Sequence, residues 1–207
     1  MIKRTSREHV LKILEDNQYD WNILDIGCNR DAVMYAQTVA DIQDLSEFYK
    51  NKDKNFVLIE DKKLPFKDNQ FDFIYASHVI EHVDDFEFFI RELERISSKG
   101  YIELPTRLGD NLVYENMNDH IWWFYFNDDD KELIASKKNQ ILQPFLNVST
   151  AKLLEDVFRD SLVIELSWEK NIDYKIDNKI RFDTIKKISF LKLLRKFISK
   201  KIRSIYK

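Results

Sequence analysis

Residues 64–104 constrain the fold of this chain more than any other stretch. Their sequence, LPFKDNQFDFIYASHVIEHVDDFEFFIRELERISSKGYIEL, predicts a turn, a buried strand at Phe71–Ala76 and a polar loop with two histidines. An amphipathic helix at Asp84–Ser97 and a second buried strand at Tyr101–Leu104 follow. A strand, a helix and a strand in this order predict half of a doubly wound α/β domain with a parallel sheet.

The rest of the chain continues the alternation. We expect Gly100 to end the preceding helix and Pro105 to stop the strand after it. The other predicted elements are a helix at 5–18, strands at 21–27, 38–42 and 55–59, a helix at 149–158 capped by Ser149 or Thr150, and closing antiparallel strands at 162–168 and 172–176. Residues 107–147 are irregular and rich in aromatics, and we expect them to form an insertion over the strand ends, as a lid or substrate pocket.

Length and composition favour one folded domain followed by a tail. The chain has 207 residues, and its single cysteine, Cys28, excludes an internal disulfide framework and fits a reducing compartment. No secretory signal or uninterrupted apolar run of the ~18–20 residues that a spanning helix needs is present, so we expect a soluble or peripheral protein. Residues 1–183 form the predicted domain, with 24 basic and 36 acidic residues, and residues 184–207 form a basic tail.

The tail predicts an amphipathic helix. Residues 184–207 carry nine Lys or Arg and no acid, and apolar residues recur at three- and four-residue steps: Ile188, Leu191, Leu194, Ile198 and Ile202. A helix of this kind binds an anionic membrane surface. Two alternatives stay open: a helix packed on the domain, and a nucleic-acid tail, which is disfavoured because the acidic domain would repel phosphate.

Several phrases of the sequence together resemble one enzyme family. They are LPF with FDF (Leu64–Phe66, Phe71–Phe73), SHVIEHV (Ser77–Val83), GYIELP (Gly100–Pro105) and a later His-x-Trp (His120–Trp122). Over roughly residues 21–126 the chain is similar to class I S-adenosylmethionine-dependent methyltransferases, in a type 11-like branch with a shortened glycine loop. The resemblance implies an α/β, Rossmann-like, doubly wound and mostly parallel seven-stranded sheet, here with the aromatic-rich insertion and the C-terminal basic amphipathic helix.

The resemblance also implies a cofactor loop after the first buried strand. That strand ends in Asp25, and the turn after it contains Gly27, Cys28 and Asn29. Glycine lets the backbone approach the methionine part of S-adenosylmethionine. The usual second glycine is Asn29 here, a residue type that tolerates left-handed backbone conformations. We expect Cys28 to be a small buried filler rather than a nucleophile.

Further cofactor contacts are implied at the ends of the next strands. Asp41 is expected to accept hydrogen bonds from the ribose hydroxyls, and Glu60 or Asp61 to lie near the adenine. Ser77 and His78 are expected to border the methionine end. The alternative for Asp41 and Asp61 is a solvated loop carboxylate.

The histidines His78, His82 and His120 are the candidate catalytic residues. We expect His120 to act as a general base toward an acceptor hydroxyl, because an imidazole is nearly half neutral close to pH 6.5. Some methyltransferases that act on small-RNA ends or quinone precursors have Glu-x-x-Glu-His here and bind a divalent metal. This chain has His78-x-x-Glu81-His82, so a metal is possible but not favoured, and structural bracing of the loop is the preferred interpretation.

The sequence therefore predicts a methyltransferase attached peripherally to the cytoplasmic face of a membrane. By resemblance to proteins of surface-polysaccharide synthesis, the expected acceptor is a sugar or a lipid-linked glycan, methylated on oxygen. Two alternatives remain open. One is a catalytically silent relative that serves as a binding or scaffold module, and the other is an RNA methyltransferase.

Overall fold

A seven-stranded, mostly parallel sheet organises the protein. In the computed structural model, which describes residues 1–179, 184–187 and 189–205, the strand order is β1-β9-β6-β5-β2-β3-β4. The central five strands are parallel, and β9 and β1 add to the β6 edge with antiparallel pairing. The strands are β1 (Ile2–Arg4), β2 (Ile23–Ile26), β3 (Thr38–Asp41), β4 (Asn55–Leu58), β5 (Phe73–Ser77), β6 (Lys99–Pro105) and β9 (Val163–Glu169). The predicted doubly wound sheet of seven strands is confirmed.

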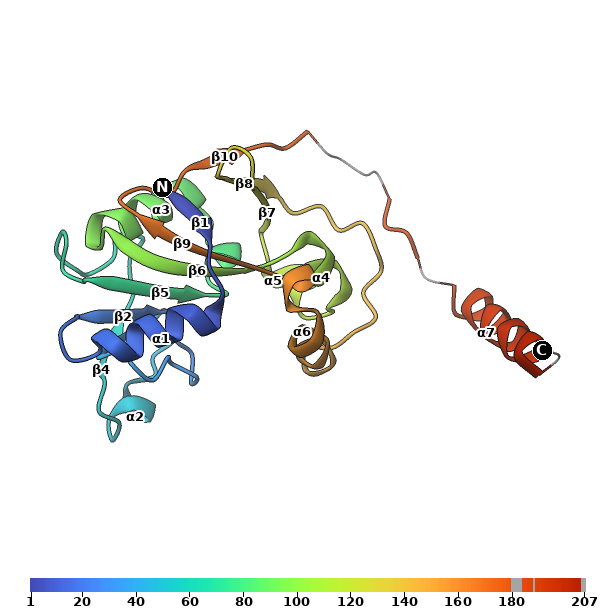
Figure 1. Cartoon of the computed structure of the whole chain (residues 1–207), viewed down its shortest axis with the longest axis horizontal. Coiled ribbons are helices and arrows are strands. Elements are labelled where there is room, and N and C mark those ends of the chain that lie inside the picture. Colours follow the sequence, from blue (N-terminus) through green and yellow to red (C-terminus); the bar gives the residue numbers. More distant parts are fainter. Residues whose placement is uncertain (180–183, 188, 206–207) are drawn as a thin grey trace.

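Helices and a second sheet cover the two faces of this sheet (Figure 1). On one face, α1 (Arg7–Asn17) and α2 (Ser46–Tyr49) pack through residues such as Leu14 and Tyr49. On the other, α3 (Phe86–Ile96) shares a core with the small sheet β10-β8-β7. The remaining elements are η1 (Ile80–His82), α4 (Arg107–Leu112), α5 (Asn116–Asp119), β7 (Trp122–Asn127), β8 (Glu132–Lys137), α6 (Val148–Leu162), β10 (Tyr174–Ile176) and α7 (Phe190–Ile205).

The seventh strand of the main sheet differs from the predicted one. Residues 172–176 were expected to close this sheet, but β10 pairs in parallel with β8 in the small sheet. Instead the N-terminal strand β1 pairs with β9, with Ile2 opposite Trp168. Of the three residues of β1, Ile2 alone is buried. Three residues are too few to show the alternation of apolar and polar residues that indicates a strand, so the sequence did not predict β1.

The segment 107–147 is ordered rather than irregular. Its aromatic run forms the antiparallel hairpin β7–β8, and four of its aromatic side chains, Trp122, Trp123, Phe124 and Phe126, are buried. Phe86 of α3 lies against the rings of Trp122 and Phe124, at 5.5 and 5.7 Å between ring centroids. The aromatic run therefore completes the core beneath α3.

Two predicted helix boundaries also need correction. Helix α3 ends at Ile96 with Ser97 as its C-cap, so Gly100 does not stop it; Gly100 lies inside β6, where a Cβ would overlap the indole of Trp168. Helix α6 is capped by the side chain of Asn147, which accepts from the Thr150 N–H at 2.8 Å, rather than by Ser149 or Thr150.

Helix α7 lies apart from the domain (Figure 1). The apolar side chains of its predicted stripe, Leu191, Leu194, Ile198 and Ile202, are all exposed. Ile188 and Lys207 of the predicted tail lie outside the described residues, as does the predicted domain boundary at 183. No helix in the described part of the chain has the length and apolar character needed to cross a bilayer.

Candidate functional site

The site lies at the carboxyl ends of the parallel strands, where the chain order reverses. From β2 the chain proceeds through β3 and β4 to one side, and β5 and β6 continue on the other side of β2. In open α/β sheets a ligand crevice forms at such a switch point. Here the strand ends of β2, β3 and β5 border two neighbouring clefts, of about 530 and 330 Å³.

The larger cleft, of about 530 Å³, is walled mainly by apolar side chains. Ile42, Ile59, Val79 and Phe88 are among its lining residues, and Ile42 is 81% exposed although it is apolar. The predicted cofactor residues on this cleft are Asp41, Glu60 and Asp61. An apolar slot with a few carboxylates at its rim suits a flat heteroaromatic base joined to a diol.

The smaller cleft, of about 330 Å³, is polar. Besides Asp25, Cys28 and Ser77, it is lined by charged side chains from α1 and α6: Arg7, Lys152, Glu155, Asp156 and Arg159. Gly27, Asn29 and His78 line both clefts, so the two clefts meet at these three residues. The structure thus brings all nine sequence-predicted cofactor residues onto one continuous surface.

Gly27 has a conformation and a surrounding that only glycine satisfies. Its φ is +71°, in the left-handed region, and a Cβ there would overlap Cγ2 of Val79. Its N–H donates to Ala40 O at 2.7 Å, which joins the turn to the end of β3. Asn29 has a φ of +42°, so the prediction that an asparagine supports a left-handed position in this turn is confirmed.

Asp41 holds the turn and the strand end together. Its Oδ2 accepts from the Asn29 N–H and its Oδ1 from the Gln43 N–H, both at 2.9 Å. Each carboxylate oxygen carries two lone pairs, so both oxygens retain one for a ligand hydroxyl. Asp41 therefore shapes the cleft and can also accept hydrogen bonds from a diol.

The crossover from β2 to β3 contains no helix. Residues 27–37, all described, form a loop that two charged side chains hold from inside. Asp25 Oδ2 accepts from the Val33 N–H at 2.6 Å, and Lys54 Nζ donates to the carbonyls of Val33, Met34 and Ala36 at 3.1, 3.1 and 2.7 Å. The cation satisfies carbonyls that a helix would have paired internally.

Burial sets the protonation of two groups beneath this loop. It raises the pKa of Asp25 to about 7, against the opposing effects of the Val33 N–H and the Lys54 charge. It also raises the pKa of the Cys28 thiol to about 12, so this buried thiol stays neutral and is a poor nucleophile.

His78 links the clefts to a buried charge network. Its φ is +54°, its Nδ1 lies 3.1 Å from Glu81 Oε1, and its Nε2 lies 3.4 Å from Glu103 Oε1. Burial alone would lower the pKa of His78, but hydrogen bonds to Glu103 and Glu81 raise it to about 10. This imidazole is therefore protonated near neutral pH, which favours holding two carboxylates over accepting a proton.

The network continues into α6 and β9. Arg159 Nη2 lies 2.6 Å from Glu103 Oε2, and its Nε donates to Glu165 Oε1 at 2.8 Å. Burial would raise the pKa of Glu103, but hydrogen bonding and charge from His78, with the charge of Arg159, lower it to about 2. Arg159 was not predicted from sequence, because it approaches the site only through the packing of α6.

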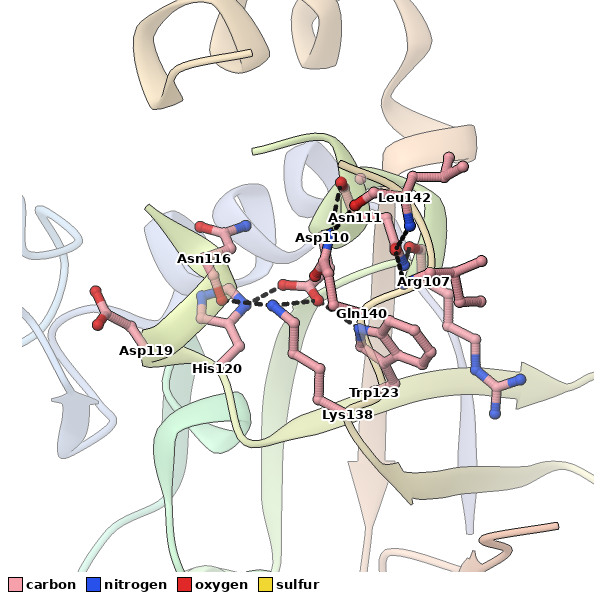
Figure 2. A network of polar contacts seen from close by, with 12 residues as sticks. Arg107, Asp110, Asn111, Asn116, Asp119, His120, Trp123, Lys138, Gln140 and Leu142 are labelled. Carbon is pink, nitrogen blue, oxygen red and sulfur yellow. Dashed lines mark hydrogen bonds and ion pairs between the residues drawn. The ribbon is translucent and has the colours of Figure 1, made fainter. Parts of the chain in front are cut away.

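His120 and His82 form a pair beside the larger cleft. Their rings meet edge to face, with centroids 4.6 Å apart, and His82 lines the cleft whereas His120 lines neither cleft. His120 Nδ1 lies 2.5 Å from Asp110 Oδ1, and Lys138 Nζ lies 2.8 Å from Asp110 Oδ2. Figure 2 shows His120, Lys138 and Trp123 converging on this carboxylate.

Asp110 is a central residue of the site that the sequence did not reveal. It is completely buried in α4, and burial would raise its pKa, but contacts with His120 and Lys138 lower the pKa instead. Asp110 therefore stays ionised behind His120. None of the residues from 107 to 147, all described, lines either cleft, so this segment contributes to the site from behind, through Asp110 and His120.

Comparison with known proteins agrees with this geometry. Residues 19–102 match the family model described as a methyltransferase domain. A norajmaline N-methyltransferase from Rauvolfia serpentina is 35% identical over 83 residues, which are 40% of this chain and 27% of that protein. The chain thus spans about a quarter of the length of this curated relative.

Solved structures of similar shape are more distant in sequence. The PH0226 protein from Pyrococcus horikoshii OT3 is 16% identical, with 80% of this chain and 92% of that chain covered and a TM-score of 0.43. A SAM-dependent methyltransferase from Aquifex aeolicus is 14% identical, with 78% and 87% covered and a TM-score of 0.42.

The sheet order and the switch-point clefts are the arrangement with which open α/β domains bind ligands such as nucleotides. The match of residues 19–102 to the methyltransferase-domain model is consistent with the resemblance to class I methyltransferases that the sequence indicated.

Proposed function

We propose that the protein transfers a methyl group from S-adenosylmethionine to a hydroxyl of a sugar or a lipid-linked glycan at the cytoplasmic surface of a membrane. The observation that carries the proposal is the pair of joined clefts at the switch point. The apolar cleft suits the adenosine, with the ribose at Asp41, and the polar cleft suits the amino and carboxylate groups of the methionine end. The methyl group would then lie near Gly27 and His78, where the clefts meet.

Positioning would supply much of the rate. Methyl transfer from a sulfonium is an in-line displacement, so holding the two reactants in contact and alignment is the main task. The acceptor hydroxyl must lose its proton, and we assign this loss to the His82–His120 pair beside the larger cleft. His120 contacts His82 but lines neither cleft, so it is not expected to touch the cofactor. We therefore expect His120→Ala to reduce turnover far more than affinity for S-adenosylmethionine. Unchanged turnover would remove His120 from the mechanism.

The membrane part of the proposal rests on α7. Its exposed apolar residues include Phe190, Leu191 and Phe197, which are 73%, 77% and 61% exposed, and its other face carries six Lys or Arg. A helix with these two faces favours the interface of an anionic bilayer. A membrane-bound enzyme would meet an acceptor that is itself attached to lipid.

Calorimetric titration of the purified chain with S-adenosylmethionine and S-adenosylhomocysteine tests the cofactor. We expect micromolar binding that weakens at least about tenfold in Asp41→Ala, because hydrogen bonds to a charged acceptor contribute about 1.5–3 kcal/mol. Asp20→Asn, an exposed carboxylate before β2, is the matched control and should bind as the unchanged protein does. A folded protein that binds neither compound would support the silent-relative alternative.

Transfer of a radioactive methyl group separates the acceptors. Label from S-adenosylmethionine should enter lipid-linked glycans isolated from membranes and resist mild base, as an ether does. Label in RNA instead would favour the RNA methyltransferase alternative.

A further inference from the structure

Helix α6 presents three charged side chains to the smaller cleft, of about 330 Å³, and they form what we call the α6 face. Lys152, Glu155 and Asp156 are three and four residues apart, so they lie on one side of the helix, and all three line the cleft. Among the described residues, none of the three has a hydrogen-bond or ion-pair partner. Oppositely charged residues at these spacings can pair with each other, but here they stay apart and available to a ligand.

Arg159, the next charged residue on the same side of α6, is engaged by the fold. Its guanidinium contacts Glu103 at 2.6 Å and Glu165 at 2.8 Å. The charge network of the domain therefore uses Arg159 but not the α6 face. Holding the sheet and the helix together does not explain why the other three charged residues line the cleft.

A buried hydroxyl in the same cleft also lacks a partner. Tyr75 of β5 lines the cleft and is only 3% exposed, and its hydroxyl has no hydrogen-bond partner in the described part of the chain. Burial and the charge of Glu103 raise the pKa of Tyr75, so the hydroxyl keeps its proton. A buried donor without an acceptor costs about 1–3 kcal/mol, which a hydrogen bond to a ligand oxygen would offset.

The amino-acid end of S-adenosylmethionine would use only part of this cleft. That end carries one carboxylate and one ammonium group, so it needs a cation and a few oxygen acceptors. Arg7 of α1 and Asp31 of the loop 27–37 also line the cleft, and neither side chain has a hydrogen-bond or ion-pair partner among the described residues. These two can hold the amino-acid end, and the α6 face then remains for a second ligand.

The charges of the α6 face discriminate between kinds of acceptor. One ammonium group and two carboxylates give it a net negative charge, which disfavours phosphate and therefore RNA. The carboxylates accept hydrogen bonds and the ammonium donates them, so together they suit a ligand whose groups do both. Hydroxyls do both, and a sugar ring carries several of them close together.

We propose that the α6 face and the Tyr75 hydroxyl bind the acceptor, as an uncharged ring with several hydroxyls, such as a sugar. This assignment rests on the proposed function and gives its acceptor a place in the structure. The ring would lie in the smaller cleft and present one hydroxyl where the two clefts meet. Residues 107–147, all described, were expected to form the substrate pocket but line neither of the two clefts, so α6 takes this role.

Binding of simple sugars, measured by nuclear magnetic resonance, tests the subsite without turnover. Isotope-labelled full chain is titrated with the methyl glycosides of glucose, galactose and mannose, with and without S-adenosylhomocysteine. We expect at least one of these glycosides to bind at millimolar concentration and to shift the amide signals of α6. The uronate of the same sugar, which adds a negative charge, should bind more weakly.

Two variants of α6 provide a matched comparison. The double variant Glu155→Gln, Asp156→Asn keeps the side-chain sizes and should weaken binding of the glycoside at least tenfold, because hydrogen bonds to charged groups contribute about 1.5–3 kcal/mol each. It should also reduce the discrimination against the uronate. Asp160→Asn changes an exposed carboxylate of α6 that lines neither cleft, and should bind as the unchanged protein does.

Tyr75→Phe separates binding from stability. Removing a buried hydroxyl that has no partner should leave the unfolding free energy unchanged or raise it, whereas affinity for the glycoside should fall at least threefold. Unchanged affinity would remove Tyr75 from the subsite. Failure of all three glycosides to bind, or binding that the double variant leaves intact, would overturn the α6 subsite.

The subsite and the proposed function can fail separately. Sugar binding that depends on Glu155 and Asp156, in a protein that binds no S-adenosylmethionine, would leave the subsite standing and the methyl transfer refuted. Binding of S-adenosylmethionine by a protein that binds none of the glycosides would do the reverse, and label transferred to RNA would then identify the acceptor class.

Discussion

Gly27 lies where the two clefts meet and has no room for an additional carbon atom. Gly27→Ala adds a methyl group that overlaps Val79 and places a Cβ at a φ of +71°. We expect a loss of about 2–5 kcal/mol in unfolding free energy, from about 1–2 kcal/mol of backbone strain and about 1–3 kcal/mol of overpacking. Urea unfolding followed by fluorescence measures this loss, and calorimetry measures the accompanying loss of S-adenosylmethionine affinity.

A double variant separates the two causes. Val79→Ala in the Gly27→Ala background removes the overlapping methyl groups but leaves the backbone strain, so it should restore only part of the stability. If Gly27→Ala proves as stable as the unchanged protein, the tight approach between the turn and Val79 is not a constraint on this fold.

Asp25 makes the stability depend on pH. Its pKa is raised from 3.8 to about 7 in the folded protein, so between pH 4 and pH 7 the folded state holds a proton that the unfolded state has released. Stability from this group therefore falls as pH rises through that window. Asp25→Asn cannot ionise but keeps an oxygen that accepts from the Val33 N–H. The unfolding free energy of this variant minus that of the unchanged protein should therefore increase by about 2–3 kcal/mol between pH 5 and pH 8.

Urea unfolding of both proteins at the two pH values measures that difference. Asp20→Asn, at an exposed position, provides the reference for removing a carboxylate without burial. A stability difference that is the same at pH 5 and pH 8 would contradict the raised pKa of Asp25.

At the scale of elements, the loop 27–37 depends on a residue outside it. Lys54→Met keeps the length of the side chain but removes the three hydrogen bonds to the carbonyls of Val33, Met34 and Ala36. We expect a loss of about 1–3 kcal/mol in unfolding free energy, because the partly buried carbonyls of Val33 and Ala36 lose a charged donor. Affinity for S-adenosylmethionine should fall as well, since the loop carries Cys28 and Asn29.

Thermal unfolding and calorimetry check both effects. Lys67→Met, at an exposed position before β5, is the control and should change neither. Loss of stability without loss of affinity would show that the loop shapes the fold but not the cofactor cleft.

Elements with a local signal were predictable from the sequence. Helix α3 has apolar residues at helical spacing, and strands β2 to β6 are short apolar runs that end in turn residues. The hairpin β7–β8 and the parallel pairing of β10 with β8 were missed. Paired residues of β7 and β8 are 5 to 15 positions apart in sequence, and those of β10 and β8 are 41 apart. Both pairings form around the core that these strands share with α3. Such pairing leaves no periodic mark within either segment.

Site residues likewise divide into those with a local sequence signal and those that reach the site through contacts between distant segments. The turn from Asp25 to Asn29 and the carboxylate of Asp41 lie where strands end, so position along the chain was enough to find them. Asp110 and Arg159 reach the site from α4 and α6, through contacts with His120 and Glu103. Nothing local distinguishes them from surface charges, and only the three-dimensional structure shows that Asp110 is buried.

At the scale of the whole molecule, charge is divided between two parts. Residues 1–183 carry 12 more acidic than basic groups, whereas α7 contains six Lys or Arg and no acid. Under the proposed membrane binding, an anionic surface would attract α7 and repel the domain, so the domain would stay in solution while α7 lies in the interface. Binding should therefore need both the cations and the apolar face of α7.

Flotation with lipid vesicles measures the two contributions in the full chain. The variant with Lys196→Gln, Lys200→Gln and Lys201→Gln should bind phosphatidylglycerol-rich vesicles roughly a hundredfold more weakly, since each cation contributes about 1 kcal/mol. Ile198→Asp, on the exposed apolar face, should abolish flotation even though it removes no cation. Vesicles of phosphatidylcholine alone, and high salt, should weaken binding of the unchanged protein. Equal flotation of the full chain and of a chain ending at Asp183 would contradict membrane binding through α7.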